Sequence, residues 1–321
     1  MRILVAPDSF KGSLTSVAVA RALAEGWSRA RPGDVLRLSP LADGGEGTLD
    51  AAAASGGWLE LPASARDPLG RPLAGRFLRQ GTLAIVELAT ASGLSRLPAD
   101  GLAPMAASTF GTGLILAAAV GLGVREIVLG LGGSATTDGG SGLLTALGVR
   151  LLDGAGREIP PGGGGLGSLA SVDLSGVAPV LREVSLTIAS DVSNPLLGEH
   201  GAAATYGPQK GATPGQIVEL DRDLARYAAV LEAATGRSIR DVPGAGAAGG
   251  TTAGLLAIAD RFREVRIRPG VEVMMELTGF AEALAASDLV LTGEGRIELA
   301  RVMNEARRDA RFGGLLAGWA R

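Results

Sequence analysis

Short apolar runs alternate with amphipathic segments at the start of the chain. Residues 3–6 form a run typical of a buried strand, and residues 35–38 form a second one. Each run is followed by a Gly-containing loop and then by a helical pattern, the first of which takes Thr15 as its cap. Strand, loop and helix repeated in this order are typical of a parallel α/β sheet with its functional loops at the carboxyl ends of the strands.

The hydrophobic pattern changes at about Trp58. Short strands separated by turns follow, among them residues 76–79 and 83–88. Near the end, residues 288–291 again form a strand pattern followed by a Gly-rich loop, like the two N-terminal units. We therefore predict an α/β protein with two α/β domains. One is a Rossmann-like parallel sheet built from both chain termini, and the other is a larger, mixed α/β domain.

The predicted boundaries follow these changes of pattern. The Rossmann-like domain takes residues 1–62 and 283–321, and the second domain takes residues 63–282. Within the second domain, residues 126–129 and 184–189 have the pattern of buried strands. A length of 321 residues suits two domains of ordinary size.

Composition excludes several classes of site. The chain has no Cys, which removes disulfides, thiolate catalysis and Cys-ligated metals. It has a single His, His200, which argues against multi-histidine metal sites and a His-based triad. The formal net charge of −3 predicts no basic face for nucleic acid.

Hydropathy predicts no membrane span and no signal peptide. The longest apolar stretch, residues 114–133, is interrupted by Arg125 and Glu126, so it predicts a helix followed by a buried strand. The apolar run at the N-terminus is too short for a signal peptide. We expect a cytoplasmic protein.

Only two of the 30 basic residues are lysines. They are Lys11 and Lys210, and both stand in Gly-containing loops. A lysine ammonium is a compact point charge, whereas the guanidinium of arginine is a planar fork. The two lysines are therefore candidates for contacts with an anionic ligand.

Five loops combine Gly with Ser, Thr, Lys, Asp or Glu; they are residues 7–13, 42–48, 130–140, 207–211 and 292–296. Gly lets backbone N–H groups approach an anion, and helix N-termini favour negative charge. Phosphate binding is thus the function that these loops share. Any single loop is equally well explained as a tight structural turn.

Two Gly patterns imitate a dinucleotide-binding fingerprint. Residues 244–249 follow a Pro instead of a strand, so their context does not match. Residues 130–135 do follow a strand, but the hydroxyl and acidic residues that come next suit phosphate or metal at least as well. An NAD-dependent oxidoreductase is therefore the weaker alternative function.

Carboxylates in or beside these loops are candidates for acid–base and metal chemistry. Asp191 directly follows a predicted buried strand, where a general base can be held rigidly; the alternative is an Asx turn. Asp43, Glu46 and Asp138 either cap helices or hold Mg²⁺, which takes one or two carboxylates together with phosphate oxygens. Glu294 with Arg296 forms either a surface ion pair or a ligand contact.

Six motifs in this order resemble the bacterial, type-1 family of glycerate kinases: Ala6–Leu14, Ala42–Thr48, Gly132–Gly140, Ser190–Leu196, Tyr206–Ala212 and Thr292–Ile297. The resemblance implies transfer of the γ-phosphoryl group of ATP to D-glycerate, with 2-phosphoglycerate favoured over 3-phosphoglycerate as the product. It also implies a scaffold of two α/β domains with the active site in the cleft between them. Its partners are then the small molecules D-glycerate and ATP, with Mg²⁺ as cofactor.

Phosphoryl transfer needs charge neutralisation, a metal that bridges the phosphates and an oriented hydroxyl group. We assign Asp191 as the base or orienting group, Lys11 and Lys210 to the charge of phosphate or carboxylate, and Asp43, Glu46 and Asp138 to Mg²⁺. The backbone N–H groups of Gly132, Gly133 and Ser134 are assigned to phosphate oxygens. Further predicted contacts to substrate or nucleotide come from Ser9, Gly44, Gly45, Gly47, Thr48, Thr137, Asn194, Gln209, Glu294 and Arg296.

The chain departs from the family pattern in two places. Residues 102–107 lack the Arg that usually precedes the Ser108–Gly113 motif, which removes one expected contact to the substrate carboxylate. After Ile297, Glu298 replaces an expected Asp, and residues 299–321 match none of the remaining pattern. We therefore expect a Rossmann-like domain without its final units, whose exposed sheet leads either to association with a partner, as in a homo-oligomer, or to aggregation. The alternative function is an impaired homologue that binds ligand without turnover.

Overall fold

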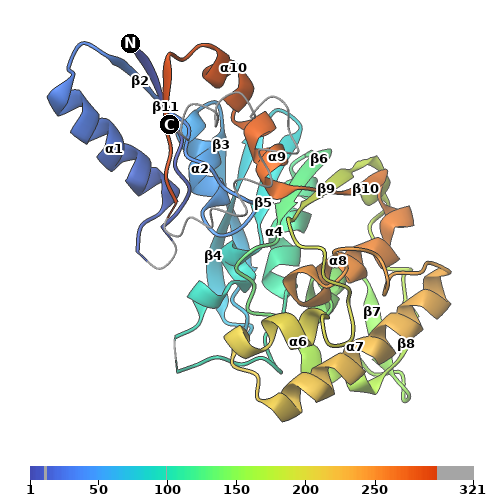
Figure 1. Ribbon diagram of the computed structural model, residues 1–321. Coiled ribbons are helices and arrows are strands. Elements are labelled where there is room, and N and C mark those ends of the chain that lie inside the picture. Colours follow the sequence, from blue (N-terminus) through green and yellow to red (C-terminus); the bar gives the residue numbers. More distant parts are fainter. Residues whose placement is uncertain (11–12, 99, 295–321) are drawn as a thin grey trace. The chain divides into compact units, whose positions relative to one another are not determined.

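The computed structural model describes residues 1–10, 13–98 and 100–294 and is shown in Figure 1. Its contacts divide the chain into two units. The terminal unit takes Met1–Leu41 together with the chain from Glu282 onward, and the central unit takes Ala42–Ala281. A short helix, α10 (Phe280–Ala285), crosses the second boundary.

The terminal unit contains a small parallel sheet. Its described strands are β1 (Arg2–Val5), β2 (Val35–Leu38) and β11 (Leu289–Leu291), in the order β11-β1-β2. Helix α1 (Ser16–Ala30) packs Ala20 and Trp27 against this sheet. The predicted cap is confirmed, since the hydroxyl of Thr15 accepts the backbone N–H of Ala18 at 3.2 Å.

The central unit is built on a mixed sheet with the order β10-β9-β6-β5-β4-β3 among the described residues. Its strands are β3 (Leu59–Arg66), β4 (Pro72–Gln80), β5 (Leu83–Glu87), β6 (Glu126–Gly130), β9 (Ser185–Ala189) and β10 (Glu264–Arg268). The three strands β3, β4 and β5 pair antiparallel, whereas β5, β6, β9 and β10 pair parallel. A separate hairpin pairs β7 (Arg150–Asp153) with β8 (Leu169–Asp173).

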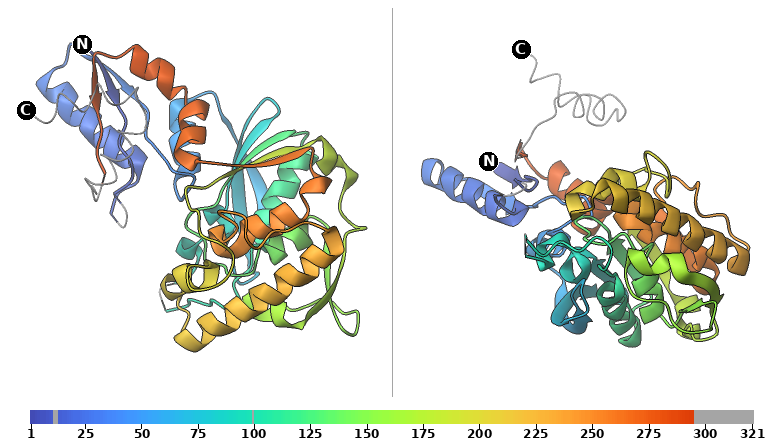
Figure 2. Two further views of the ribbon diagram at one scale, coloured as in Figure 1. Left: turned by 45° about the vertical axis from the view of Figure 1, so that its right-hand side comes forward. Right: turned by 90° about the horizontal axis from the view of Figure 1, so that it is seen from below.

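Helices cover both faces of the large sheet, as the two views of Figure 2 show. The α-helices of the central unit are α2 (Thr48–Ser55), α3 (Ala89–Ser92), α4 (Phe110–Gly121), α5 (Ser141–Ala146), α6 (Ala202–Tyr206), α7 (Pro214–Thr235), α8 (Ala247–Ala257) and α9 (Gly270–Leu277). Short 3₁₀ turns lie at Leu94–Arg96, Gly163–Ser168, Pro179–Glu183, Pro208–Lys210 and Ala259–Arg261.

The two faces differ in what packs on them. The larger core joins strand residues such as Phe77 and Ile188 to Ile115 of α4. On the other face, α2 and α9 pack against the sheet, for example through Ile85 and Met274. Because successive side chains of a strand point to opposite faces, the strands of this sheet contribute to a core on each side.

The contacts divide the chain at Leu41, whereas the sequence pattern predicts a boundary at residue 62. Helix α2 and strand β3 belong to the central unit, because Leu49, Ala51 and Ala52 pack on Leu78 and Ile85 of the large sheet. The strand–loop–helix pattern of residues 35–55 is continuous in the sequence, so it contains no signal that the chain changes units at Leu41. Within the described residues, no helix has both the length and the apolar character needed to cross a membrane.

Candidate functional site

The candidate site lies at the carboxyl edge of the four parallel strands of the central unit. Glu87, Gly130, Ala189 and Arg268 occupy one row across β5, β6, β9 and β10. The loops that follow these residues therefore leave the sheet side by side. In parallel α/β sheets this edge carries the functional loops.

The loop of residues 42–48 is held against this edge by direct backbone contact. The N–H of Gly132 donates to the carbonyl oxygen of Gly44 at 3.1 Å. A Cβ atom on Gly130 would lie 2.5 Å from the Gly44 oxygen, and one on Gly132 would lie 2.4 Å from the Cα of Gly45. Only glycine at these two positions lets the two loops approach this closely.

This contact corrects one predicted role. The N–H of Gly132 was expected to bind a phosphate oxygen, but it is used by Gly44 inside the protein. Neighbouring Gly133 takes a left-handed conformation with φ of 75°, and Ser134 is buried against the segment that follows β5. The role of Gly132 in this structure is therefore to join the two loops.

Asp191 stands two residues beyond the end of β9 and is exposed to solvent. Its Oδ1 accepts the backbone N–H of Gly270 at 3.1 Å, at the start of α9. A Cβ on Gly270 would lie 1.9 Å from the carbonyl oxygen of Asp43. The structure thus brings Asp191, Gly270 and the beginning of the 42–48 loop together.

Asp43 and Glu46 are both exposed on the 42–48 loop. Oδ1 of Asp43 accepts the N–H of Gly45 at 2.9 Å, and the hydroxyl of Thr48 donates to the carbonyl of Gly45 at 2.7 Å. Carboxylates on an open loop fit Mg²⁺, which needs one or two of them beside phosphate oxygens and water. No group of three or more acidic or His side chains placed to hold a metal occurs among the described residues.

Asp138 does not fit a metal. It is fully buried, and Oδ2 accepts from the N–H and hydroxyl of Thr109 at 2.9 and 2.8 Å and from the N–H of Gly142 at 3.2 Å. Oδ1 accepts the N–H of Gly140 at 3.1 Å. Burial raises the pKa of Asp138, and these hydrogen bonds oppose the rise. Asp138 therefore joins the starts of α4 and α5 in the interior.

Lys210 also differs from its predicted role. It is 1% exposed, and Nζ donates to the carbonyl oxygen of Thr136 at 2.5 Å. Burial lowers its pKa to about 7, although the nearby charge of Asp138 acts in the opposite direction. Lys210 therefore supports the loop around Thr136 from inside the core, and Nζ does not reach a ligand in solvent.

Three other predicted contacts of the central unit lie in different surroundings. Thr137 is fully buried and its hydroxyl has no hydrogen-bond partner in the part of the chain that the structure describes, so it too lies inside the core. Gln209 is exposed. Asn194 organises its own loop, since its amide donates to the carbonyl of His200 at 2.9 Å and accepts the hydroxyl of Tyr206 at 2.8 Å.

The terminal unit carries the remaining candidates. The N–H of Ser9 donates to Oδ1 of Asp8 at 2.6 Å, and Glu294 is exposed. The hydroxyl of Thr292 donates to the carbonyl of Ala6 at 2.9 Å, which links the two predicted loops of this unit. Lys11 and Arg296 lie outside the described residues.

Glu87 is a buried acid of this edge that pattern analysis overlooked. It is 6% exposed, and Oε2 accepts the N–H of Leu49 at 3.0 Å. Burial raises its pKa to about 6. An acidic residue that ends an apolar strand at the functional edge of a sheet is the signal that could have identified it.

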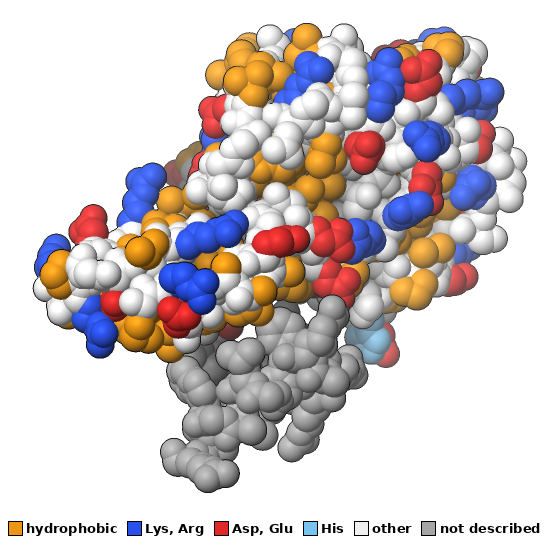
Figure 3. All heavy atoms as spheres, turned by 90° about the horizontal axis from the view of Figure 1, so that it is seen from above, with side chains coloured by type: hydrophobic (Ala, Val, Ile, Leu, Met, Phe, Trp, Pro, Cys, Tyr) orange, Lys and Arg blue, Asp and Glu red, His pale blue; other side chains and the backbone are white. Residues whose placement is uncertain are grey.

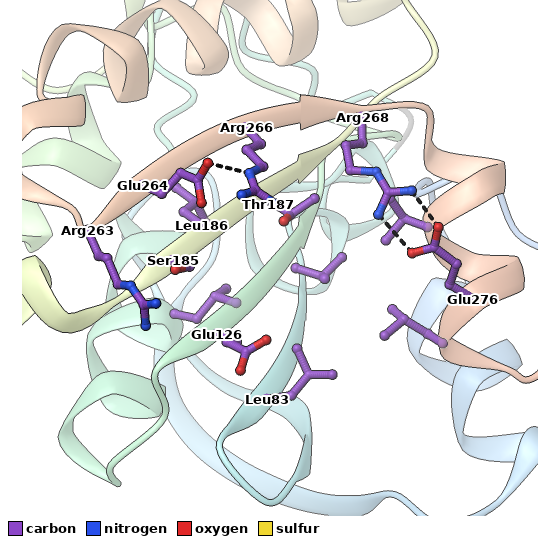
Figure 4. A pocket seen from close by; sticks show the side chains of 14 residues that line it. Leu83, Glu126, Ser185, Leu186, Thr187, Arg263, Glu264, Arg266, Arg268 and Glu276 are labelled. Atoms are coloured by element: carbon purple, nitrogen blue, oxygen red, sulfur yellow. Dashed lines mark hydrogen bonds and ion pairs between the residues drawn. The ribbon is translucent and has the colours of Figure 1, made fainter.

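A surface hollow of about 390 Å³ lies elsewhere in the central unit, between α9 and the sheet (Figure 4). Its floor includes Leu83, Glu126 and Ser185, the first residues of their strands and therefore the edge opposite the loops. Two ion pairs lie in its lining, since Arg268 binds Glu276 at 2.6 and 2.8 Å and Arg266 binds Glu264. Its lining carries three Arg and three Glu side chains, so the hollow has no net charge that would favour an ionic ligand.

Basic and acidic side chains are interspersed on the molecular face shown in Figure 3. This agrees with the small net charge of −3. No continuous basic area is visible on that face among the described residues.

Comparison with known proteins identifies the family. The glycerate kinase family model matches residues 3–304. A glycerate kinase of Halalkalibacterium halodurans is 45% identical over 92% of this chain and 77% of its own length, and glycerate 2-kinase of Escherichia coli K12 is 41% identical over 93% and 78%. A crystal structure assigned to glycerate kinase 2 of Salmonella typhimurium LT2 superimposes with a TM-score of 0.82 at 40% identity, covering 94% of this chain and 80% of that one. These matches confirm the predicted resemblance and the α/β fold class, and the chain belongs to the glycerate kinase family, a family of phosphotransferases.

Proposed function

We propose that the protein transfers the γ-phosphoryl group of ATP to a hydroxyl group of D-glycerate and forms 2-phosphoglycerate. The main support for this proposal is that loop 42–48, the segment 130–134 and Asp191 lie together at one edge of the sheet. The name of the Escherichia coli relative, glycerate 2-kinase, supports attack by the 2-hydroxyl group. A cytoplasmic location, where ATP is available, is part of the proposal.

Asp191 is proposed as the base. Its carboxylate is exposed, and the Gly270 N–H fixes its orientation from the protein side. As the substrate oxygen attacks the γ-phosphorus, Asp191 accepts the hydroxyl proton and the bond to the bridging oxygen of ADP breaks. Phosphoryl transfer requires mainly such positioning together with charge neutralisation.

Asp43 and Glu46 are the proposed carboxylates for Mg²⁺. When bound, this ion neutralises negative charge on the phosphate oxygens. Gly44, Gly45 and Gly47 allow the loop to present both carboxylates while it packs on Gly132. Asp138 and Lys210 are not part of this proposal, because both are enclosed in the core.

The remaining contacts are proposed from the family resemblance alone. They are the backbone N–H groups of Gly133 and Ser134 to phosphate oxygens, and Asn194 and Gln209 to substrate, whereas the hydroxyl of buried Thr48 is used by Gly45. Ser9, Lys11, Glu294 and Arg296 would contribute from the terminal unit. Each of these assignments stays a prediction.

The test is a coupled assay with the purified protein, D-glycerate, MgATP and detection of ADP. ADP release that depends on glycerate supports the proposal, and ³¹P NMR of the product separates the 2-phosphate from the 3-phosphate. ATP binding without glycerate-dependent turnover would instead support the impaired homologue. Binding of NADH with no binding of ATP would support an oxidoreductase.

A further inference from the structure

Glu87 ends β5 on the face that α2 covers. Side chains alternate along a strand, so Glu87 shares the face of Ile85, which packs against Leu49 of α2. Its partner across the sheet is Gly130, the residue that Gly44 approaches. Glu87 therefore stands between the sheet edge and the end of the 42–48 loop.

The carboxylate replaces a helix cap that the local sequence lacks. Gly47 is the N-cap residue of α2, has φ of 93° and provides no side-chain hydrogen bond. Glu87 accepts the N–H of Leu49 at 3.0 Å, and the nearby N–H of Gly47 also favours the charged carboxylate by lowering its pKa. The first turn of α2 is thus capped from another strand.

A carboxylate at this buried position is less favourable than an uncharged side chain, because burial disfavours the charged form. Burial raises the pKa of Glu87 to about 6, so at neutral pH the residue carries a charge in the interior. The other charged groups that face it are Asp50 and Arg76, which bind each other at 2.6 Å. A charge kept at this cost points to a use of the residue beyond packing.

The loop that Glu87 holds is anchored at three places. Asp43 packs on Gly270, Gly44 accepts from Gly132, and Leu49, directly after the loop, donates to Glu87. Between the second and third anchors lies Glu46, whose side chain forms no hydrogen bond or ion pair with the other described residues. The orientation of Glu46 therefore depends on the backbone that these anchors hold.

We propose that Glu87 is a positioning residue that, through the amides of Gly47 and Leu49, holds loop 42–48 and its carboxylates in the arrangement needed for phosphoryl transfer. This inference rests on the proposed function. Glu87 touches no reacting group, and its effect passes through the backbone of the loop. Substitutions that remove the acceptor oxygen of Glu87 should therefore increase the mobility of loop 42–48 and slow phosphoryl transfer.

The test compares variants of nearly equal size. Glu87→Gln keeps an acceptor oxygen, whereas Glu87→Met removes it and fits an apolar site. Asp153→Ala is the matched control, because Asp153 accepts the N–H groups of Ala155 and Arg157 at 2.8 and 3.0 Å in the separate β7–β8 hairpin. Each protein is studied by steady-state kinetics and by hydrogen exchange of the peptide that covers residues 42–50.

In Glu87→Met, we expect faster exchange of this peptide and a fall of at least about tenfold in kcat/KM for glycerate. Glu87→Gln and Asp153→Ala should stay within about threefold of the parent. If Glu87→Met gives no cooperative melt, Glu87→Asp takes its place, since its shorter carboxylate cannot reach both amides. The same loss is expected.

Unchanged exchange at 42–50 in the acceptor-free variant would overturn the inference, and so would faster exchange with parental kcat/KM. A parent enzyme without activity on glycerate would refute the proposed function instead. The exchange experiment would then still decide whether Glu87 holds the loop.

Discussion

At the scale of single residues, burial decides which polar groups can meet a ligand. Asp191 and Lys210 are both polar residues in loops that match the family, yet Asp191 is exposed and Lys210 is enclosed. A local motif carries no information about which distant segment will cover it. Thr136 belongs to a segment 74 positions away from Lys210, and its carbonyl receives the ammonium group.

Replacing Asp191 by Asn should lower kcat by at least about 100-fold, since the amide cannot accept the hydroxyl proton. The melting temperature should stay close to that of the parent, because Asn keeps an oxygen for the Gly270 N–H. Steady-state kinetics and a thermal melt check both statements. A kcat within a few-fold of the parent would remove Asp191 from the role of base.

Lys210 should make the free energy of unfolding depend on pH above neutrality. Because its pKa is lowered from 10.5 to about 7 in the folded protein, the unfolded chain binds the extra proton between these values. Stability therefore rises with pH in this interval. Denaturant unfolding at about pH 7 and about pH 9 should show this rise in the parent and a smaller one in Lys210→Met. Equal slopes in the two proteins would contradict it.

Glu87 should act on stability in the opposite direction. Its pKa is raised from 4.5 to about 6, so the folded protein binds more protons than the unfolded chain between these values. Stability falls as pH rises through this interval, by about 2 kcal/mol in total. Denaturant unfolding at both ends of the interval should show the fall in the parent and a flatter response in Glu87→Gln. An equally steep fall in the variant would assign it to other groups.

At the scale of secondary structure, the candidate site depends on close contact between the backbone of loop 42–48 and the backbone that follows β6. Gly44 and Gly45 lie on Gly130 and Gly132 at distances that exclude a Cβ. Glycines in these loops had been assigned to phosphate binding, but here they let the loop and the sheet edge approach. A Gly-rich loop sequence fits both phosphate binding and close backbone packing. Only the distance between the two loops shows which of these roles the glycines have.

Gly132→Ala should therefore lower stability by about 1–3 kcal/mol and reduce activity, since its Cβ would lie 2.4 Å from Gly45 Cα. The control is Gly26→Ala in the exposed middle of α1, where no atom lies within 4 Å of the added Cβ. It should stabilise the protein by about 0.5–1 kcal/mol, since alanine is the better helix former. Thermal and denaturant melts of the pair check the difference. Two variants of equal stability would argue against the close contact.

At the scale of the whole molecule, the two units differ greatly in the core that each can bury. The described core of the terminal unit is centred on Ile3, Val5 and Ala20, whereas the central unit packs both faces of a larger sheet. Stability within a protein follows such differences in packing. The units should therefore open with different free energies.

Amides of β1 should exchange faster than those of β6 under native conditions, although both strands are buried parallel strands. Hydrogen exchange followed by mass spectrometry measures this directly. MgATP with glycerate provides a second condition, in which bound ligand should slow exchange at the loops that it contacts. Equal exchange in both strands would mean that the two units unfold together.

Much of this protein could be read from local patterns. The strands at 126–129, 184–189 and 288–291 and the cap at Thr15 depend on neighbours in the chain, and the structure contains them. The family, too, was identified from local motifs, and its model matches residues 3–304. The unit boundary at Leu41, the enclosure of Asp138 and Lys210, and the capping of α2 by Glu87 depend on segments far away in sequence. Periodicity and turn chemistry are local properties, whereas burial and hydrogen-bond pairing are set by whichever distant segment packs there.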